Sequence, residues 1–219
     1  GVQTMNVMTT VDGIAVLHTR IVTGTGGGPE KTIFNSPRYM RGTGYRELAC
    51  YLRPPDDPGF AVLRQRAAAK DCPLIEVDDA SAFSLDSLRR LAAICREHDV
   101  RIWHGHDYKT NLFGVLLKPF VGFKLVTTVH GWVKHTSKTP LYYAIDRWTL
   151  PRHEQVIVVS SDLYERCRAS GVPENRLHLI ENAIKYGVSP QEEGAVIALH
   201  AQIVGSRLRI TVSDTGPGV

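Results

Sequence analysis

One segment of the chain concentrates polar side chains of high chemical versatility. It reads WHGHDYKTN (residues 103–111) and contains His104, His106, Asp107 and Lys109. A carboxylate and an ammonium group at this spacing can accept hydrogen bonds from a hydroxylated ligand and donate to it. The alternative is a metal site of His104, His106 and Asp107, which lacks a ligand from a further element. We interpret the segment as a polar acceptor pocket, with Asp107 as a candidate catalytic residue.

A further histidine follows a β-rich, apolar run. In TTVHGWVKH (residues 127–135), His130 stands beside Gly131 at the end of what reads as a buried strand. A neutral imidazole in this position can orient a hydroxyl group. We therefore take His130 as the second candidate catalytic residue, against the alternative of an ordinary structural histidine.

A glycine-rich turn, TGTGGGPEKT (residues 23–32), lies between a predicted strand and a predicted helix. Glycines let the backbone approach a phosphate closely, and the start of the helix supplies N–H donors. Two known phosphate-binding patterns fail, because Glu30 precedes Lys31 where a P-loop needs glycine and Pro29 takes the last position of GxGxxG. The alternative is merely a tight strand–helix turn. The candidate phosphate- or acceptor-binding residues are Gly26, Gly27, Gly28, Lys31 and Lys109.

Short β-rich runs alternate with helical patterns up to residue 180. We expect strands at 14–20, 45–52, 73–77, 100–104, 124–129, 155–159 and 176–180, and helices at 30–41, 61–70, 85–98, 110–117, 141–150 and 162–169. Strands with crossover helices predict an α/β Rossmann-like parallel sheet with helices on both faces. Such sheets bind ligands at the carboxyl ends of their strands, where the three segments above fall.

The pattern changes after residue 180. Residues 194–214 alternate between apolar and polar side chains on either side of 204–206, which predicts an antiparallel hairpin. We divide the chain into a disordered or artificially added start (1–13), a Rossmann-like domain (14–180) and a C-terminal helix and hairpin tail (181–219). A tail of this kind does not continue the strand–helix alternation, so it predicts a different architecture.

The overall charge and composition argue against several classes of protein. The net charge is +4, but the sequence has no basic stripe with interleaved aromatic residues, which nucleic-acid binding needs. No apolar run reaches the roughly 18 residues of a membrane span, so we expect no transmembrane segment and at most weak contact with a membrane surface. The cysteines are widely spaced, which favours a reducing, cytoplasmic location.

The segments of residues 14–184 together resemble the N-terminal, acceptor-binding half of retaining glycosyltransferases with two Rossmann domains (the GT-B architecture). The resemblance rests on VLHTRIVTGTGGGPEKTI, WHGHDYKTN, TTVHGW and VIVVSSDLYERCRASGVPENRLHLIENAI. It implies a nucleotide sugar as donor and a glycan or lipid-linked acceptor. It also implies that the glycine loop lies near the donor diphosphate and that His130 positions the acceptor or the transferred sugar.

The remaining residues resemble a second family. ENAIKYG (181–187) is similar to the Asn box of ATP-binding domains of histidine-kinase type, and DTGPG (214–218) to their first glycine box. This resemblance implies that Asn182 binds magnesium and Glu181 acts on water or the nucleophile. It also implies that Lys185 approaches the phosphates and that Asp214 reads the adenine amino group. Gly216 and Gly218 would let the protein backbone pass close to the nucleotide.

The combined interpretation is a chimera. We expect a glycosyltransferase-like protein, weakly active or inactive because the donor-binding domain is missing. The alternatives are a non-catalytic nucleotide-binding module that takes Mg-ATP, and a folded chimera without native activity. An orphan strand edge in the tail also predicts a homodimer formed through residues 185–219.

Overall fold

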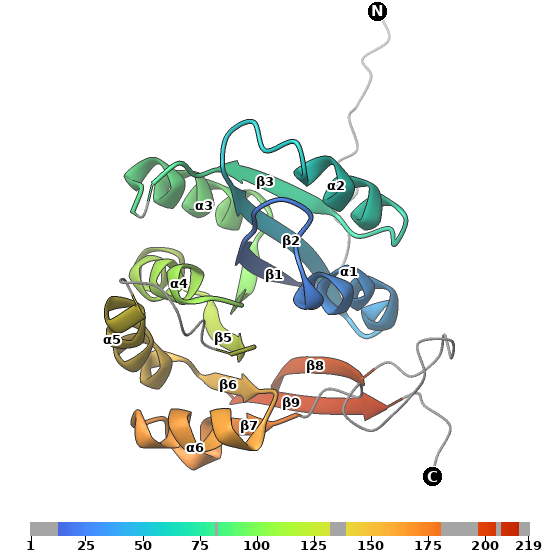
Figure 1. The fold of residues 1–219 in the computed structure, drawn as a ribbon. Coiled ribbons are helices and arrows are strands. Elements are labelled where there is room, and N and C mark those ends of the chain that lie inside the picture. The colour runs from blue at the N-terminus through green and yellow to red at the C-terminus, as the bar shows by residue number, and fades with distance from the viewer. Residues whose placement is uncertain (1–12, 82, 132–138, 181–196, 205–206, 215–219) are drawn as a thin grey trace, which may run out of the picture.

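A computed structural model describes residues 13–81, 83–131, 139–180, 197–204 and 207–214. Its centre is a parallel sheet of seven strands in the order β3-β2-β1-β4-β5-β6-β7 (Figure 1). The strands are β1 (Ile14–Ile21), β2 (Tyr45–Arg53), β3 (Leu74–Asp78), β4 (Val100–Gly105), β5 (Lys124–Val129), β6 (Gln155–Val158) and β7 (Leu177–Leu179). The expected Rossmann-like α/β class is confirmed.

Helices connect the strands in the expected alternation. They are α1 (Gly28–Met40), α2 (Phe60–Ala68), α3 (Leu85–Glu97), α4 (Tyr108–Val121), α5 (Thr139–Thr149) and α6 (Ser161–Ala169), with short 3-10 turns η1 (Leu150–Arg152) and η2 (Glu174–Arg176). Helix α4 is longer at both ends than the sequence pattern predicts. Asp107 caps its first turn and Gly122, in a left-handed conformation, ends it.

The core lies on both faces of the sheet. Leu17 and Trp103 face a cluster built with α3 and α4, whereas Ala49 and Tyr51 face a second cluster built with α1 and α2. Neighbouring residues of a strand point to opposite faces, so Val16 joins a third cluster instead of that of Leu17. Each strand of the sheet centre therefore contributes to the packing on both sides.

The predicted C-terminal hairpin is present. Strands β8 (Ile197–Val204) and β9 (Arg207–Asp214) pair antiparallel and form a sheet of their own. Strand β8 lies against α1. The strands start and end within three residues of the predicted alternation.

The strand order reverses between β1 and β4. The chain moves outward from β1 through β2 to β3, then returns to the other side of β1 with β4 (Figure 1). At such a reversal the loops after the two central strands diverge and leave room for a ligand at the carboxyl edge. The two segments that contain the glycines and His106 follow β1 and β4, so both reach this edge.

Candidate functional site

A group of buried histidines occupies the carboxyl half of the central strands. His18 of β1 lies directly opposite His104 of β4 in the strand register. His106 follows β4, and His130 follows β5. His18, His104 and His106 are almost inaccessible to solvent, whereas His130 is partly exposed at the edge.

The imidazole rings stack on one another. The ring centroids of His104 and His106 lie 4.4 Å apart, and those of His106 and His130 lie 5.3 Å apart. Hydrogen bonds link ring nitrogens along the stack, between His106 Nδ1 and His130 Nε2 at 3.0 Å and between His18 Nδ1 and His106 Nε2 at 3.1 Å. His104 is held separately, by a contact of 2.8 Å between its Nε2 and the Thr128 hydroxyl.

His104, His106 and His130 are neutral at physiological pH. Burial and the neighbouring imidazoles hold the pKa of His104 and His106 well below the usual value. Burial lowers the pKa of His130 to about 4, with a smaller effect of the Arg20 charge. A neutral imidazole carries one N–H donor and one bare nitrogen, so each ring can accept and donate at once.

Three of the histidines meet the distance requirement of a metal site. Nitrogens of His18, His104 and His106 lie within 4.8 Å of one another. However, ligand rings of a metal site point their lone pairs at one common centre. Here the rings stack, and His18 and His106 direct nitrogens at each other. The geometry therefore suits a hydrogen-bonded chain better than ligation. Asp107, the third member of the metal site considered from sequence, is not in this cluster.

Asp107 holds two elements together. Its Oδ2 accepts from the backbone N–H of Ile21 at 2.7 Å, and its Oδ1 accepts from Lys109 N and Thr110 N in the first turn of α4. Burial raises the pKa of this carboxyl group, opposed by the hydrogen bonds from Thr110 and Ile21. Its oxygens thus fix the end of β1 against the start of α4, beside the histidines.

Lys109 has a buried partner. Its ammonium group forms an ion pair with Asp79 and donates to the carbonyl of Ser81. Both charged side chains of the pair are almost completely buried. In this structure Lys109 therefore joins α4 to the segment after β3 and does not extend toward the glycine loop.

The glycine-rich loop is closed by a carboxylate of the protein itself. Glu30 is buried, and its side chain accepts from Gly27 N and pairs with Arg20 Nε at 2.6 Å. Gly26 adopts a φ of +72°, and a Cβ there would come within 2.9 Å of the Glu30 side chain. Added Cβ atoms at Gly27 and Gly28 meet no close neighbour, and Lys31 is exposed.

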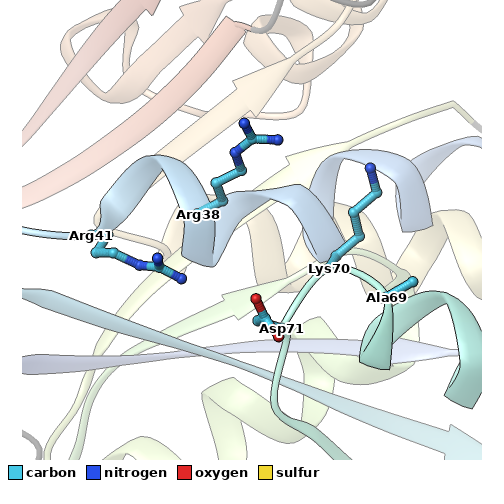
Figure 2. Close-up of a pocket in the computed structure, with 5 residues that line it drawn as sticks. All are labelled: Arg38, Arg41, Ala69, Lys70 and Asp71. Carbon is cyan, nitrogen blue, oxygen red and sulfur yellow. The ribbon is translucent and has the colours of Figure 1, made fainter.

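A cavity of about 210 Å³ lies far from this site. It is lined by Arg38, Arg41, Ala69, Lys70 and Asp71, from the end of α1 and the turn after α2 (Figure 2). Helices of a parallel sheet end at the amino edge of the strands, so this cavity opens at the opposite edge from the histidines. Its lining is solvent-exposed, which leaves it as a shallow surface feature.

Two members of the cluster were not among the candidates from sequence. His18 lies inside a predicted strand, and Glu47 of β2 contacts it, with 3.5 Å between His18 Nε2 and Glu47 Oε1. A charged residue within a strongly apolar strand pattern was the signal that could have found Glu47. Nothing local pointed to His18, because a single histidine within a strand is common.

A comparison of the sequence with models of protein families identifies the family of this chain. Residues 26–186 match the model of Glycosyltransferase Family 4. The chain belongs to this family.

Solved structures agree with this family assignment in fold. A glycosyltransferase from Rickettsia africae is 18% identical with a TM-score of 0.58, over 78% of this chain and 43% of that one. Anabaena HepE in complex with UDP is 16% identical with a TM-score of 0.57, over 77% and 44%. UDP-GlcNAc 2-epimerase from Neisseria meningitidis bound to UDP-GlcNAc is 11% identical with a TM-score of 0.59, over 78% and 47%.

The Family 4 chain thus spans less than half the length of these structures. A comparison with curated proteins gives no significant match. Within the described part of the chain, no helix has the length and apolar character that crossing a membrane requires.

Among the candidates in the tail, Asp214 lies within the described residues. Asp214 is the last residue of β9 and pairs with Ile197 across the hairpin. The family match extends to residue 186 and so includes the first three candidates of the tail. Five candidates lie outside the described residues: Glu181, Asn182, Lys185, Gly216 and Gly218. Their kinase-type roles and the chimeric origin stay predictions.

Proposed function

We propose that this Family 4 chain forms the acceptor-side domain of a nucleotide-sugar-dependent glycosyltransferase, with His130 as the residue that contacts the reacting sugar or its acceptor. The observation that supports the proposal is the position of His130. It follows β5 at the carboxyl edge and remains partly exposed, while His106 holds its inner nitrogen. A neutral imidazole so anchored can accept a hydrogen bond from a sugar hydroxyl.

The ligand class follows from the neighbours and from the loop after β1. HepE was solved with UDP, and the Neisseria epimerase with UDP-GlcNAc. In this chain, Gly27, Gly28 and Lys31 are exposed beside the start of α1, where backbone N–H groups and a lysine favour an anion. We infer that a diphosphate approaches this loop from the carboxyl edge.

Catalysis by this chain alone is expected to be weak or absent. The matched structures are more than twice as long as the segment that this chain covers. In the proposal a further domain holds most of the nucleotide, so binding here is no tighter than about millimolar. The acceptor is a glycan or a lipid-linked sugar, with the reaction in the cytoplasm and no more than surface contact with a membrane.

A titration followed by amide NMR tests the proposal, with UDP and UDP-glucose as probes. We expect saturable shifts at the loop after β1 and around His130. His130→Ala should abolish the response to the glucose moiety that distinguishes the two probes. The matched control is His178→Ala, since His178 lies on β7, two strands away from β5, and contacts Gln155. Shifts that cluster around Arg38 and Arg41 instead would contradict the proposed site.

The C-terminal tail carries a separate proposal, that residues 181–219 derive from an ATP-binding domain of histidine-kinase type. It is supported by the sequence boxes and by the antiparallel hairpin between them. Residues 181–219 contain only part of such a cradle, so we expect these 219 residues to bind Mg-ATP no better than about millimolar. Calorimetry checks this: micromolar binding that is lost in Asn182→Ala and Asp214→Ala would show a more complete nucleotide site.

A further inference from the structure

A continuous chain of polar contacts runs from the edge of the sheet into its interior. It starts at His130 Nε2, which lies 3.0 Å from His106 Nδ1. His106 Nε2 then lies 3.1 Å from His18 Nδ1. The last contact joins His18 Nε2 to Glu47 Oε1 at 3.5 Å. The chain thus links a partly exposed imidazole to a carboxylate that is 5% exposed.

The nitrogens alternate along this chain in a way that couples the three rings. At each contact an Nδ1 faces an Nε2, and one of the two must carry the hydrogen while the other offers a lone pair. If His18 carries its hydrogen on Nε2, its Nδ1 is bare and accepts from His106 Nε2. His106 Nδ1 is then bare and accepts from His130 Nε2. The tautomer of one ring therefore dictates the tautomer of the next.

Glu47 fixes the direction of the chain. His18 Nε2 and Glu47 Oε2 are both buried without a hydrogen-bond partner, and the Glu47 carboxylate oxygen Oε1 lies 3.5 Å from His18 Nε2. A bare nitrogen facing a carboxylate would place two lone pairs together, whereas an N–H there is stabilised by the negative charge. The hydrogen of His18 therefore belongs on Nε2.

We propose that Glu47 and His18 are positioning residues that act through His106 to hold His130 with its hydrogen on Nε2, so that His130 Nδ1 presents a lone pair to a ligand hydroxyl at the carboxyl edge. Among the described residues, the His130 ring has one hydrogen bond, at Nε2, and none at Nδ1. The inference rests on the proposed function for the identity of the ligand only. The tautomer itself is a property of the free protein.

The same chain can carry a proton inward. When His130 Nδ1 takes a proton from a hydroxyl, the Nε2 proton of His130 passes to His106 Nδ1. The Nε2 proton of His106 passes to His18 Nδ1, and that of His18 passes to Glu47 Oε1. Three neutral rings and one carboxylic acid result, and the reverse sequence returns the proton to the alkoxide or its product. No buried imidazolium is left, which burial and the nearby Arg20 charge disfavour at His106 and His130.

Nitrogen NMR on the free 219-residue chain, labelled in its histidine rings, tests this directly. We expect one-sided N–H···N couplings across both contacts, from His130 Nε2 to His106 Nδ1 and from His106 Nε2 to His18 Nδ1. All three rings should carry hydrogen on Nε2 alone at neutral pH. A ring of the three with hydrogen on Nδ1, or the absence of both couplings, would overturn the proposal.

The variant Glu47→Gln tests whether Glu47 sets the direction of the hydrogen bonds between the histidine rings. An amide can either accept or donate at His18 Nε2, so the imposed direction is lost and the ring nitrogens of all three histidines should shift together toward a tautomer mixture. Glu76→Gln is the matched control, because Glu76 is a partly buried glutamate on the next strand, β3, paired with Arg53 and Arg64. In that variant the three rings should keep their wild-type shifts.

A response confined to His18 in Glu47→Gln, with His130 unchanged, would show that Glu47 does not reach the edge. Should Glu47→Gln not fold, the wild-type couplings still decide. Failure of this inference is distinct from failure of the proposed function. The spectra need no ligand, whereas the glycosyltransferase proposal fails when UDP-glucose leaves the region of His130 unaffected.

Discussion

Glu30 occupies the position at the start of α1 that an anionic ligand would otherwise take. Its carboxylate accepts from Gly27 N and pairs with Arg20, and the side chain is 1% exposed. A helix start favours negative charge, so the glutamate satisfies the loop in the absence of a ligand. A phosphate that bound at this loop would have to lie beside the carboxylate or displace it.

We expect Glu30→Ala to lower the free energy of unfolding by about 3 kcal/mol, because Arg20 is left as a largely buried charge without its partner. Arg20 is 20% exposed, so water limits the loss to the lower end of the range for buried pairs. Urea denaturation measures this loss in the free energy of unfolding. The control Glu174→Ala breaks an exposed contact with Arg168 and should cost less than about 1 kcal/mol. Equal losses in both variants would contradict the structural role of Glu30.

The buried histidines predict a loss of stability in acid. Burial lowers the pKa of both His130 and His153 to about 4 from the ordinary 6.5. Their folded-state pKa is depressed, so the unfolded chain binds more protons between these values. The contribution is fully present above pH 6.5 and is lost as pH falls toward 4, with each shift worth roughly 3 kcal/mol.

Urea titrations between pH 7 and 4.5 check this expectation. Two histidines alone should give a slope of roughly 2 kcal/mol per pH unit near pH 5, and His104 and His106 add to it. In His153→Gln the slope should decrease by about 1.4 kcal/mol per pH unit, because one proton fewer is bound on unfolding. Stability that stays constant over this range would show that the rings are not neutral and buried.

At the scale of elements, the fit of α4 against the sheet positions the site. Asp107 and Lys109 tie its first turn to β1 and to the segment after β3. Gly114 lets the helix approach so closely that Trp103 can donate to the carbonyl of Thr110 at 3.1 Å. A Cβ at Gly114 would lie 2.7 Å from Trp103 Nε1 and 2.8 Å from Leu125 Cδ2.

We therefore expect Gly114→Ala to reduce the free energy of unfolding by about 2 kcal/mol, because the methyl group overpacks a fully buried contact. Gly28→Ala is the control, since a Cβ there meets nothing within 4 Å and alanine favours the helix. Thermal unfolding of both variants checks the pair. A neutral Gly114→Ala would mean that α4 can shift outward without cost.

At the scale of the whole molecule, the hairpin of β8 and β9 is not part of the seven-stranded sheet. Each of its strands pairs only with the other among the described residues, so both outer edges lack a partner strand there. Unpaired strand edges readily recruit other strands, and a two-fold dimer is the commonest closed solution. The hairpin is therefore the structural element through which the tail could form the interface predicted from sequence.

We predict a homodimer in which residues 185–219 supply much of the interface. Light scattering should give twice the chain mass of 24.3 kDa for the full chain. Removal of residues 185–219 should give a monomeric or aggregation-prone product. A well-behaved monomer of the full chain would refute the prediction.

Local sequence determined the elements and the edge at which ligands are expected. The apolar spacing in 85–98 and the Ser160 cap belong to single helices, so they are legible without knowledge of the fold. The seven strands fall within two residues of their predicted bounds for the same reason. The place of His130 at a carboxyl end also follows directly from the end of its strand.

Tertiary structure decided which side chains meet. His18 and His106 are 88 residues apart in the chain and touch only because β1 and β4 are neighbours in the sheet. The same strand order brings Glu47 of β2 to His18, and it gives Asp107 the backbone of Ile21 as partner. Spacing along a chain carries no record of strand order, which results from the packing of helices on both faces. The sequence alone therefore indicated a histidine at the edge, and only the folded sheet connected it to a buried carboxylate.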